Sequence, residues 1–130
     1  MTVRVLLDTP IALWAIAGSA RLAPEAQAAI LAADEVFVSA ASLWEIAIKH
    51  ALRKSDMPIS AAQALQVFDD AGYCLLTIQP QHILEVEKLP PIHKDPFDRL
   101  LIAQAFVEPL RLITRDPLIA KYGAGIMRVA

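Results

Sequence analysis

The sequence contains a single cysteine, Cys74, among its 130 residues. One cysteine excludes an intramolecular disulfide, and such sparse cysteine usage fits a reducing compartment, so we expect a cytoplasmic protein. Apolar runs are also short, and none reaches the roughly 18 residues that a membrane-spanning helix needs. Asp8 interrupts the first apolar run too early for a secretory signal peptide. These absences disfavour membrane proteins and disulfide-stabilised secreted proteins.

Internal repeats, low-complexity tracts and interdomain linkers are also missing, and the length suits a single domain spanning residues 1–130. Apolar residues make up 56% of the chain, which is ample for a buried core. Charged residues make up only 20%, so a disordered chain is not expected. The sequence therefore predicts one compact folded unit.

Short apolar segments alternate with helical segments along the chain. The expected strands span residues 3–7, 36–38, 73–78 and 111–114, with an edge strand at 126–129. The expected helices span about residues 10–17, 24–33, 60–71, 80–89 and 96–106, with a third helix, capped by Ser39 or Ser42, ending near Lys54, and a last short helix opened by Asp116-Pro117. This alternation predicts an α/β fold with a parallel sheet of four to five strands and helices on both faces.

Four short acidic motifs interrupt these apolar segments. They are Leu6-Leu7-Asp8-Thr9, Ser42-Leu43-Trp44-Glu45, Asp95-Pro96-Phe97-Asp98 and Thr114-Arg115-Asp116. Asp8 directly follows the first expected strand and Asp116 closely follows the fourth, so both belong at the carboxyl edge of the sheet, where such folds bind ligands. Glu45 and Asp98 are expected in the first turns of helices. Carboxylates gathered at one edge repel one another unless a cation lies between them, and an all-oxygen set suits Mg²⁺ or Mn²⁺. Hydrolysis of a phosphodiester is a common use of such a cluster.

Helix capping is the alternative account of these acids. Each lies near a helix start, and Ser42-x-x-Glu45 matches a capping box. Capping is the better account for Asp95, which directly precedes a proline. It is weakest for Asp8, because Thr9 is expected to cap the first helix. For the other three acids both roles stay open.

The charge balance does not by itself indicate a nucleic-acid partner, because 12 basic and 14 acidic residues give a formal net charge of −2. Setting aside the five acids of the motifs leaves nine acids against the 12 basic residues. The remaining surface is therefore mildly basic, which permits phosphate binding. Arg99 and Arg115, each beside a motif acid, are candidate phosphate contacts, although each could pair with a neighbouring acid instead.

The motifs, in this order and at these spacings, resemble the PIN-domain ribonucleases of the VapC toxin type. The resemblance extends from Val3 to about Met127. The matching stretches are Leu6-Leu7-Asp8-Thr9-Pro10 with Leu13-Trp14, then residues 39–49, residues 93–105, and Leu112-Ile113-Thr114-Arg115-Asp116 with Tyr122-Gly123. One such motif would be weak, whereas four in order are specific.

This resemblance implies a PIN-like three-layer α/β/α fold and metal-dependent endonucleolytic cleavage of RNA. The implied metal-binding and catalytic residues are Asp8, Glu45, Asp98 and Asp116. Mg²⁺ is the implied ion, with Mn²⁺ able to substitute. Thr114 is expected to orient an acid or a bound water, and Asp95 to act behind the ligands or as a cap. The resemblance also implies a small antitoxin partner and a homodimer.

Two other functions remain as alternatives. The first is a PIN fold that keeps its acids but only binds RNA or a protein. The second is a receiver-like signalling domain with one Mg²⁺ and a phospho-acceptor aspartate. The receiver design needs an aspartate after a middle strand, where this sequence has Ile78-Gln79-Pro80.

Aromatic and histidine residues receive structural interpretations. Core packing is the expected role of Trp14, Trp44 and Phe97. The histidines show no metal-ligand spacing and are expected at surface or loop positions, with His93 the nearest to the site. These residues are His50, His82 and His93.

Overall fold

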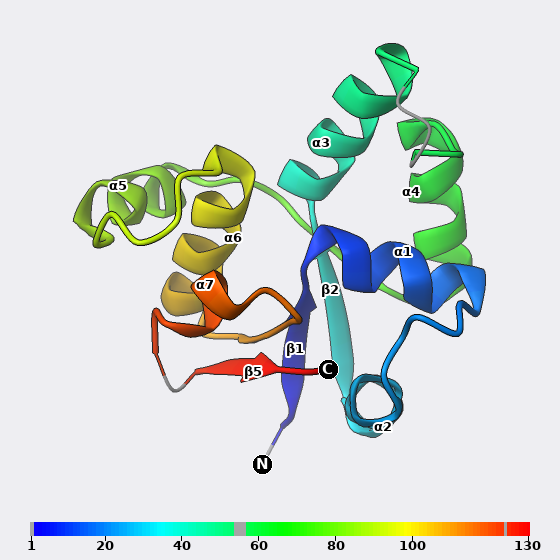
Figure 1. The fold of residues 1–130 in the computed structure, drawn as a ribbon, viewed down its shortest axis with the longest axis horizontal. Coiled ribbons are helices and arrows are strands. Elements are labelled where there is room, and N and C mark those ends of the chain that lie inside the picture. The colour runs from blue at the N-terminus through cyan, green and yellow to red at the C-terminus, as the bar shows by residue number, and fades with distance from the viewer. Residues whose placement is uncertain (1, 54–56, 124) are drawn as a thin grey trace.

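Figure 1 shows the computed structural model, which describes residues 2–53, 57–123 and 125–130. The strands are β1 (Arg4–Leu7), β2 (Glu35–Ser39), β3 (Cys74–Leu76), β4 (Arg111–Thr114) and β5 (Ile126–Arg128). The helices are α1 (Thr9–Ala17), α2 (Pro24–Ala32), α3 (Ala40–Ala51), α4 (Ala61–Asp70), α5 (Pro80–Lys88), α6 (Pro96–Val107) and α7 (Pro117–Ala120). Within these described ranges, no helix is both long and apolar enough to cross a membrane.

The five strands form one parallel sheet in the order β3-β2-β1-β4-β5. The central strand β1 pairs with β2 on one side and with β4 on the other. The chain therefore winds outward from β1 in one direction through β2 and β3, and later in the other direction through β4 and β5. The carboxyl ends of β1 and β4 flank the point where this direction reverses, which is where parallel α/β folds form a ligand crevice.

Two hydrophobic cores lie on opposite faces of the sheet. Val5, Leu7 and Ile113 point into the core that also takes side chains from α1, α2, α3 and α4. Leu6 and Leu112 point into the other core, which is filled largely by the buried face of α6. In Figure 1, α5 and α6 lie on one side of the strands and α1, α2 and α4 on the other. The expected three-layer α/β/α architecture with a parallel sheet is confirmed.

Most element boundaries agree with the sequence, and the differences have local causes. Asp8, not Thr9, caps α1, because its Oδ1 accepts a hydrogen bond from the Ile11 N–H at 3.0 Å. Gly18 ends α1 as expected, with a left-handed φ of 61° that favours glycine. Strand β3 stops at Leu76, short of the expected residue 78, because its partner β2 ends opposite Leu76. The end predicted for the third helix, Lys54, lies outside the described residues.

Helix α3 is anchored at its start by buried polar contacts. Ser39 caps α3, accepting a hydrogen bond from the Ala41 N–H at 3.0 Å, and its hydroxyl donates to Oε1 of Gln104 on α6 at 2.5 Å. One turn later, the Ser42 hydroxyl accepts a hydrogen bond of 2.8 Å from Thr9 at the start of α1. These contacts fix α3 against β2, α1 and α6, and so fix the position of Glu45 on that helix.

Candidate metal centre

The four predicted acids come from four different segments and meet at the carboxyl edge of the sheet. Asp8 follows β1, Asp116 follows β4, Asp98 lies in the first turn of α6 and Glu45 lies in the second turn of α3. Their charges act on one another: Asp116 and Glu45 contribute to raising the pKa of Asp8, and Asp8 and Glu45 to raising that of Asp98. These acids are therefore close enough to interact and are called the acidic cluster below. In the described part of the chain, the tighter group whose ligand atoms all lie within 4.8 Å of one another is His93, Asp98 and Asp116.

Asp8 is the most deeply buried acid, with 3% of its surface exposed. Its Oδ1 caps α1, and its Oδ2 accepts a hydrogen bond of 2.5 Å from the Thr114 hydroxyl. Burial raises the pKa of Asp8 to about 6, mainly by desolvation, against the opposing effect of these two hydrogen bonds. Each oxygen accepts one bond here, and a carboxylate offers roughly four lone-pair sites. Asp8 therefore retains capacity to bind a cation.

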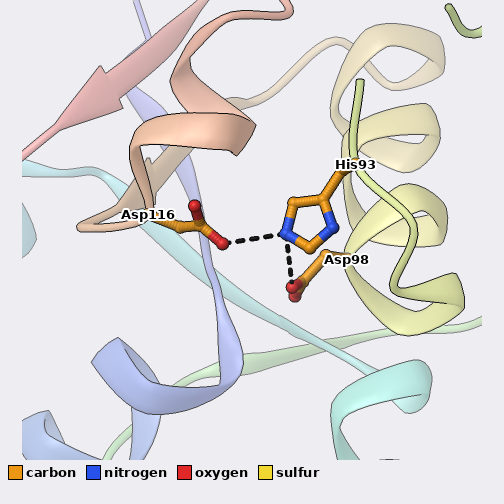
Figure 2. Close-up of side chains that lie close together, drawn as sticks. All are labelled: His93, Asp98 and Asp116. Carbon is orange, nitrogen blue, oxygen red and sulfur yellow. Dashed lines mark hydrogen bonds and ion pairs between the residues drawn. The ribbon is translucent and has the colours of Figure 1, made fainter. Parts of the chain in front are cut away.

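Asp98 and Asp116 share a histidine between them. Nε2 of His93 lies 2.8 Å from Oδ2 of Asp116 and 3.1 Å from Oδ2 of Asp98 (Figure 2). Burial, together with the charges of nearby carboxylates, raises the pKa of Asp98 to about 7. Burial alone would also raise the pKa of Asp116, but hydrogen bonds from His93 and the Leu118 N–H outweigh it and hold that pKa below its ordinary value.

Glu45 is 7% exposed, and one of its carboxylate oxygens is buried without a hydrogen-bond partner among the described residues. Its Oε2 pairs with Nζ of Lys49 one turn along α3 at 2.8 Å. In the described part of the chain, Oε1 of Glu45 is the one buried side-chain nitrogen or oxygen without a hydrogen-bond partner. A buried carboxylate oxygen left unpaired is costly. A cation in the acidic cluster would satisfy it, so the donor set fits a hard divalent metal ion.

Capping and membership of the cluster are not exclusive. Asp116 caps α7 through Oδ1, which accepts from the Leu118 N–H at 2.8 Å, while its Oδ2 faces His93. Asp95 caps α6, with Oδ1 accepting from the N–H groups of Phe97 and Asp98, as the sequence favoured. The capping box that Ser42 and Glu45 offered as an alternative does not form, because α3 begins at Ala40 and Ser39 is its cap.

The two arginines beside the cluster differ in their contacts. The guanidinium of Arg99 is enclosed by the end of α5 and the loop before α6, and it donates to four backbone carbonyls and to the Tyr122 hydroxyl. The carbonyls belong to Val86, Leu89, Pro90 and His93. Arg99 therefore braces this loop, and the structure gives no support for the phosphate contact expected there. Arg115 is exposed and lies over the Trp14 ring, with its guanidinium carbon 5.4 Å from the ring centroid.

Two side chains depart from their sequence-based interpretations, and a third, His93, lies even closer to the site than expected. Trp44, expected in the core, is 58% exposed and meets Phe97 edge-to-face at 5.0 Å between ring centroids. His82, expected at the surface, is fully buried, with Nε2 2.6 Å from Oε2 of Glu108. His93 lies within the cluster itself. The available signal was its place in the loop that runs directly into the Asp95 cap, but histidine in a loop is too common to identify a site.

Known proteins share this sequence pattern and this fold. The model of the PIN domain family matches residues 5–125. Ribonuclease VapC22 of Mycobacterium tuberculosis (strain ATCC 25618 / H37Rv) is 34% identical over 113 residues, covering 86% of each chain.

Two solved structures share the fold. One is VapBC2 from Rickettsia felis bound to a DNA fragment from their promoter, with a TM-score of 0.65, 15% identity and 97% coverage of each chain. The other is a toxin-antitoxin complex from Klebsiella pneumoniae, with a TM-score of 0.64, 21% identity and 95% coverage of each chain. At these identities the structures show the fold alone. The sequence match along nearly the whole length decides the family: the chain belongs to the PIN-domain family and is of the VapC type.

Proposed function

We propose that this protein is a Mg²⁺-dependent endoribonuclease that acts as the toxin of a toxin–antitoxin pair, with Mn²⁺ able to replace Mg²⁺. The observation that carries the proposal is the four-carboxylate cluster, in which Asp8 and Glu45 are buried and Oε1 of Glu45 has no hydrogen-bond partner among the described residues. The 34%-identical relative is a ribonuclease by name, and the structures that share the fold come from toxin–antitoxin complexes. Membership of the PIN-domain family also argues against the alternative of a receiver-like signalling domain.

In this proposal Asp8 and Asp98 bind the metal directly, and Glu45 and Asp116 bind it directly or through water. A bound divalent ion supplies an activated water and compensates the charge that develops on the scissile phosphate. Thr114 holds one oxygen of Asp8 in place and leaves other lone pairs of that carboxylate available to a cation at the carboxyl ends of β1 and β4. Asp95 orients the first turn of α6 and thereby Asp98. Hydrolysis joins a water oxygen to phosphorus and breaks one phosphoester bond, and the departing oxygen takes up a proton.

The substrate is proposed to be RNA that approaches across this acidic edge. Arg115 is exposed directly beside Asp116 and is our candidate for a phosphate contact. Trp44 and Phe97 directly precede Glu45 and Asp98 in the sequence and form an aromatic pair of which Trp44 is more than half exposed. Exposed aromatic rings are suitable surfaces for stacking unpaired bases.

We further propose that the protein binds an antitoxin and forms a homodimer. We also propose that it acts in the cytoplasm. An apolar pocket of about 380 Å³ lies between α1 and α4, where Leu13, Trp14 and Val67 contribute to its lining. Trp14 also carries Arg115 on its ring, so the pocket adjoins the acidic edge. A partner segment with apolar side chains could fill this pocket and continue across the cluster.

The proposal is tested by cleavage of single-stranded and structured RNA by the purified protein with Mg²⁺, with Mn²⁺ and with excess chelator. Cleavage should require the metal and should be lost in Asp98→Asn and Glu45→Gln. Asp69→Asn, which changes an exposed aspartate on α4, is the matched control and should cleave as wild type does.

A toxin role adds a second readout. Induced expression of wild type in a bacterial host should arrest growth, and expression of Asp98→Asn should not. Metal binding without cleavage of any RNA would instead favour a PIN fold that only binds RNA or a protein. Cleavage that persists in chelator and in Asp98→Asn would contradict the proposal.

A further inference from the structure

His93 is held at every polar atom. Its backbone N–H donates to the Tyr122 hydroxyl at 2.7 Å, and its carbonyl accepts from Arg99 at 3.2 Å. Ring atom Nδ1 accepts a hydrogen bond of 3.1 Å from the Asp95 N–H. Nε2 faces the two acids in Figure 2, and only 10% of the side chain is exposed. A residue fixed in this way is part of a built site, in contrast to a mobile loop side chain.

The contact at Nδ1 determines where the ring carries its proton. A ring nitrogen that accepts a hydrogen bond from a backbone N–H carries no proton itself, so the proton of the neutral ring is on Nε2. Nε2 is then a donor and has no free lone pair. Nε2 and carboxylate oxygens of Asp98 and Asp116 lie within 4.8 Å of one another, which would suit a three-ligand metal site. The tautomer argues against that use of His93.

We infer that His93 is a positioning residue: its Nε2–H donates between Asp98 and Asp116 and holds both carboxylates in the orientation that a cation needs. The inference rests on the proposed function, and it adds a residue that acts on the metal through its ligands. One N–H shared by two carboxylates also reduces their mutual repulsion when no metal is bound. The remaining lone pairs of the two acids stay available, because His93 contacts one oxygen of each.

The anchoring of His93 indicates that its Nε2–H, and not only the bulk of its ring, carries this role. Asp95 fixes one side of the ring while it caps the helix that carries Asp98, so the donor and one acceptor share a single anchor. Hydrogen-bonded groups behind metal ligands typically account for about 10–100-fold in metal affinity. Loss of the donor should therefore weaken metal binding, although His93 is not a ligand.

Two substitutions separate the donor from the bulk of the ring. His93→Gln keeps an N–H donor near the position of Nε2, whereas His93→Phe keeps the ring volume without a donor. The readout is Mn²⁺ affinity, measured by titration calorimetry. We expect affinity about tenfold or more weaker in His93→Phe, and largely restored in His93→Gln. His50→Gln and His50→Phe, at an exposed histidine on α3, are the matched controls and should bind as wild type does.

Unchanged or tighter Mn²⁺ binding in His93→Phe would overturn the inference, and so would a loss as large in His93→Gln. A second measurement needs no variant. In ¹⁵N-labelled wild type, the imidazole spectrum should show the proton of His93 on Nε2, both without metal and after saturation with Mg²⁺. Loss of this Nε2–H on addition of Mg²⁺ would identify His93 as a ligand and overturn the inference.

Failure of the proposed function gives a different pattern. Wild type that binds no Mn²⁺ and cleaves no RNA would contradict the metal-dependent nuclease, whatever the state of His93. The donor role is then judged in chelator, where the melting temperature of His93→Phe should lie below that of His93→Gln because the two carboxylates lose their shared donor. Equal melting temperatures would overturn the donor role by itself.

Discussion

Thr114 Oγ1 donates a hydrogen bond of 2.5 Å to Oδ2 of Asp8 and joins two buried residues that lie 106 positions apart in the sequence. The bond ties the end of β4 to the end of β1 at the carboxyl edge of the sheet. Thr114 also accepts the Asp116 N–H at 3.0 Å, so one hydroxyl organises the acids that follow both strands. This pairing is possible only because β1 and β4 are neighbours in the sheet.

Removal of this hydroxyl should affect Asp8 directly. Thr114→Val keeps the shape of the side chain but leaves the buried carboxylate without its donor, so we expect a loss of about 1.5–3 kcal/mol in the free energy of unfolding at neutral pH. The pKa of Asp8 should rise further, because the bond favours the ionised form. Chemical denaturation and carboxyl ¹³C titration measure the two effects. Thr114→Ser, which keeps the hydroxyl, is the control, and an equal loss in both variants would contradict this account.

The metal-free protein should lose stability as pH rises through the weakly acidic range. Asp98 has a pKa near 7 in the folded state against 3.8 for an unperturbed aspartate, so the folded state binds more protons between these values. The free energy of unfolding therefore falls as pH rises from about 4 to about 7. Asp98→Asn removes this contribution. In chelator, the stability advantage of Asp98→Asn over wild type should grow across this window and then level off. A difference that does not depend on pH would show that the pKa of Asp98 is not raised.

Metal should reverse that instability. With a site of about 1 mM affinity, roughly 10 mM Mn²⁺ adds about 1.4 kcal/mol, which is a rise of a few degrees in melting temperature for a domain of this size. The rise should be absent in Asp98→Asn and in Asp8→Asn. It should also be larger at pH 8 than at pH 5, because Asp8 and Asp98 must lose their protons to bind the ion. A rise of the same size in all three proteins would place the metal elsewhere.

Asp95 should behave as a cap that also tunes its neighbour. Asp95→Asn keeps an N-cap acceptor, whereas Asp95→Ala should cost about 1 kcal/mol of stability. Both changes remove a charge that helps to raise the pKa of Asp98, so that pKa should fall in each variant. Denaturation curves and the titration of Asp98 separate the two roles. The assignment of Asp98 as a metal ligand and of Asp95 as a cap would be wrong if Asp95→Asn impaired RNA cleavage as severely as Asp98→Asn.

The two arginines should differ in what their loss affects. Arg99→Gln removes a guanidinium that donates to several loop carbonyls, so we expect a loss of about 1.5–3 kcal/mol in stability. Arg115→Gln removes an exposed charge and should leave stability nearly unchanged. RNA binding is compared between Asp98→Asn, which should not cleave, and the double variant that also carries Arg115→Gln. The double variant should bind RNA more weakly, and its affinity should depend less steeply on salt concentration. Weaker RNA binding in Arg99→Gln, with unchanged binding in Arg115→Gln, would instead identify Arg99 as the phosphate contact.

Much of the fold could be read from local chemistry. Prolines at helix starts, Gly18 at the end of α1 and the apolar strand segments placed nearly every element within a few residues. The acids at the carboxyl ends of strands could also be assigned to one edge, because all strands of a parallel sheet end there. The cap of α1 was predicted wrongly, because Asp8 and Thr9 are both good capping residues. Only the tertiary structure shows that the Thr9 hydroxyl bonds to Ser42 while Asp8 caps the helix.

The sequence by itself determined the succession of strands and helices, the placement of acids after β1 and β4, and the family to which the chain belongs. The tertiary structure alone decided that His93 lies between Asp98 and Asp116. It also decided that the guanidinium of Arg99 is hydrogen-bonded to backbone carbonyls and that Trp44 is exposed. The physical reason is that element type depends on neighbours along the chain. Burial, hydrogen-bond partners and pKa depend on which distant segments are packed side by side.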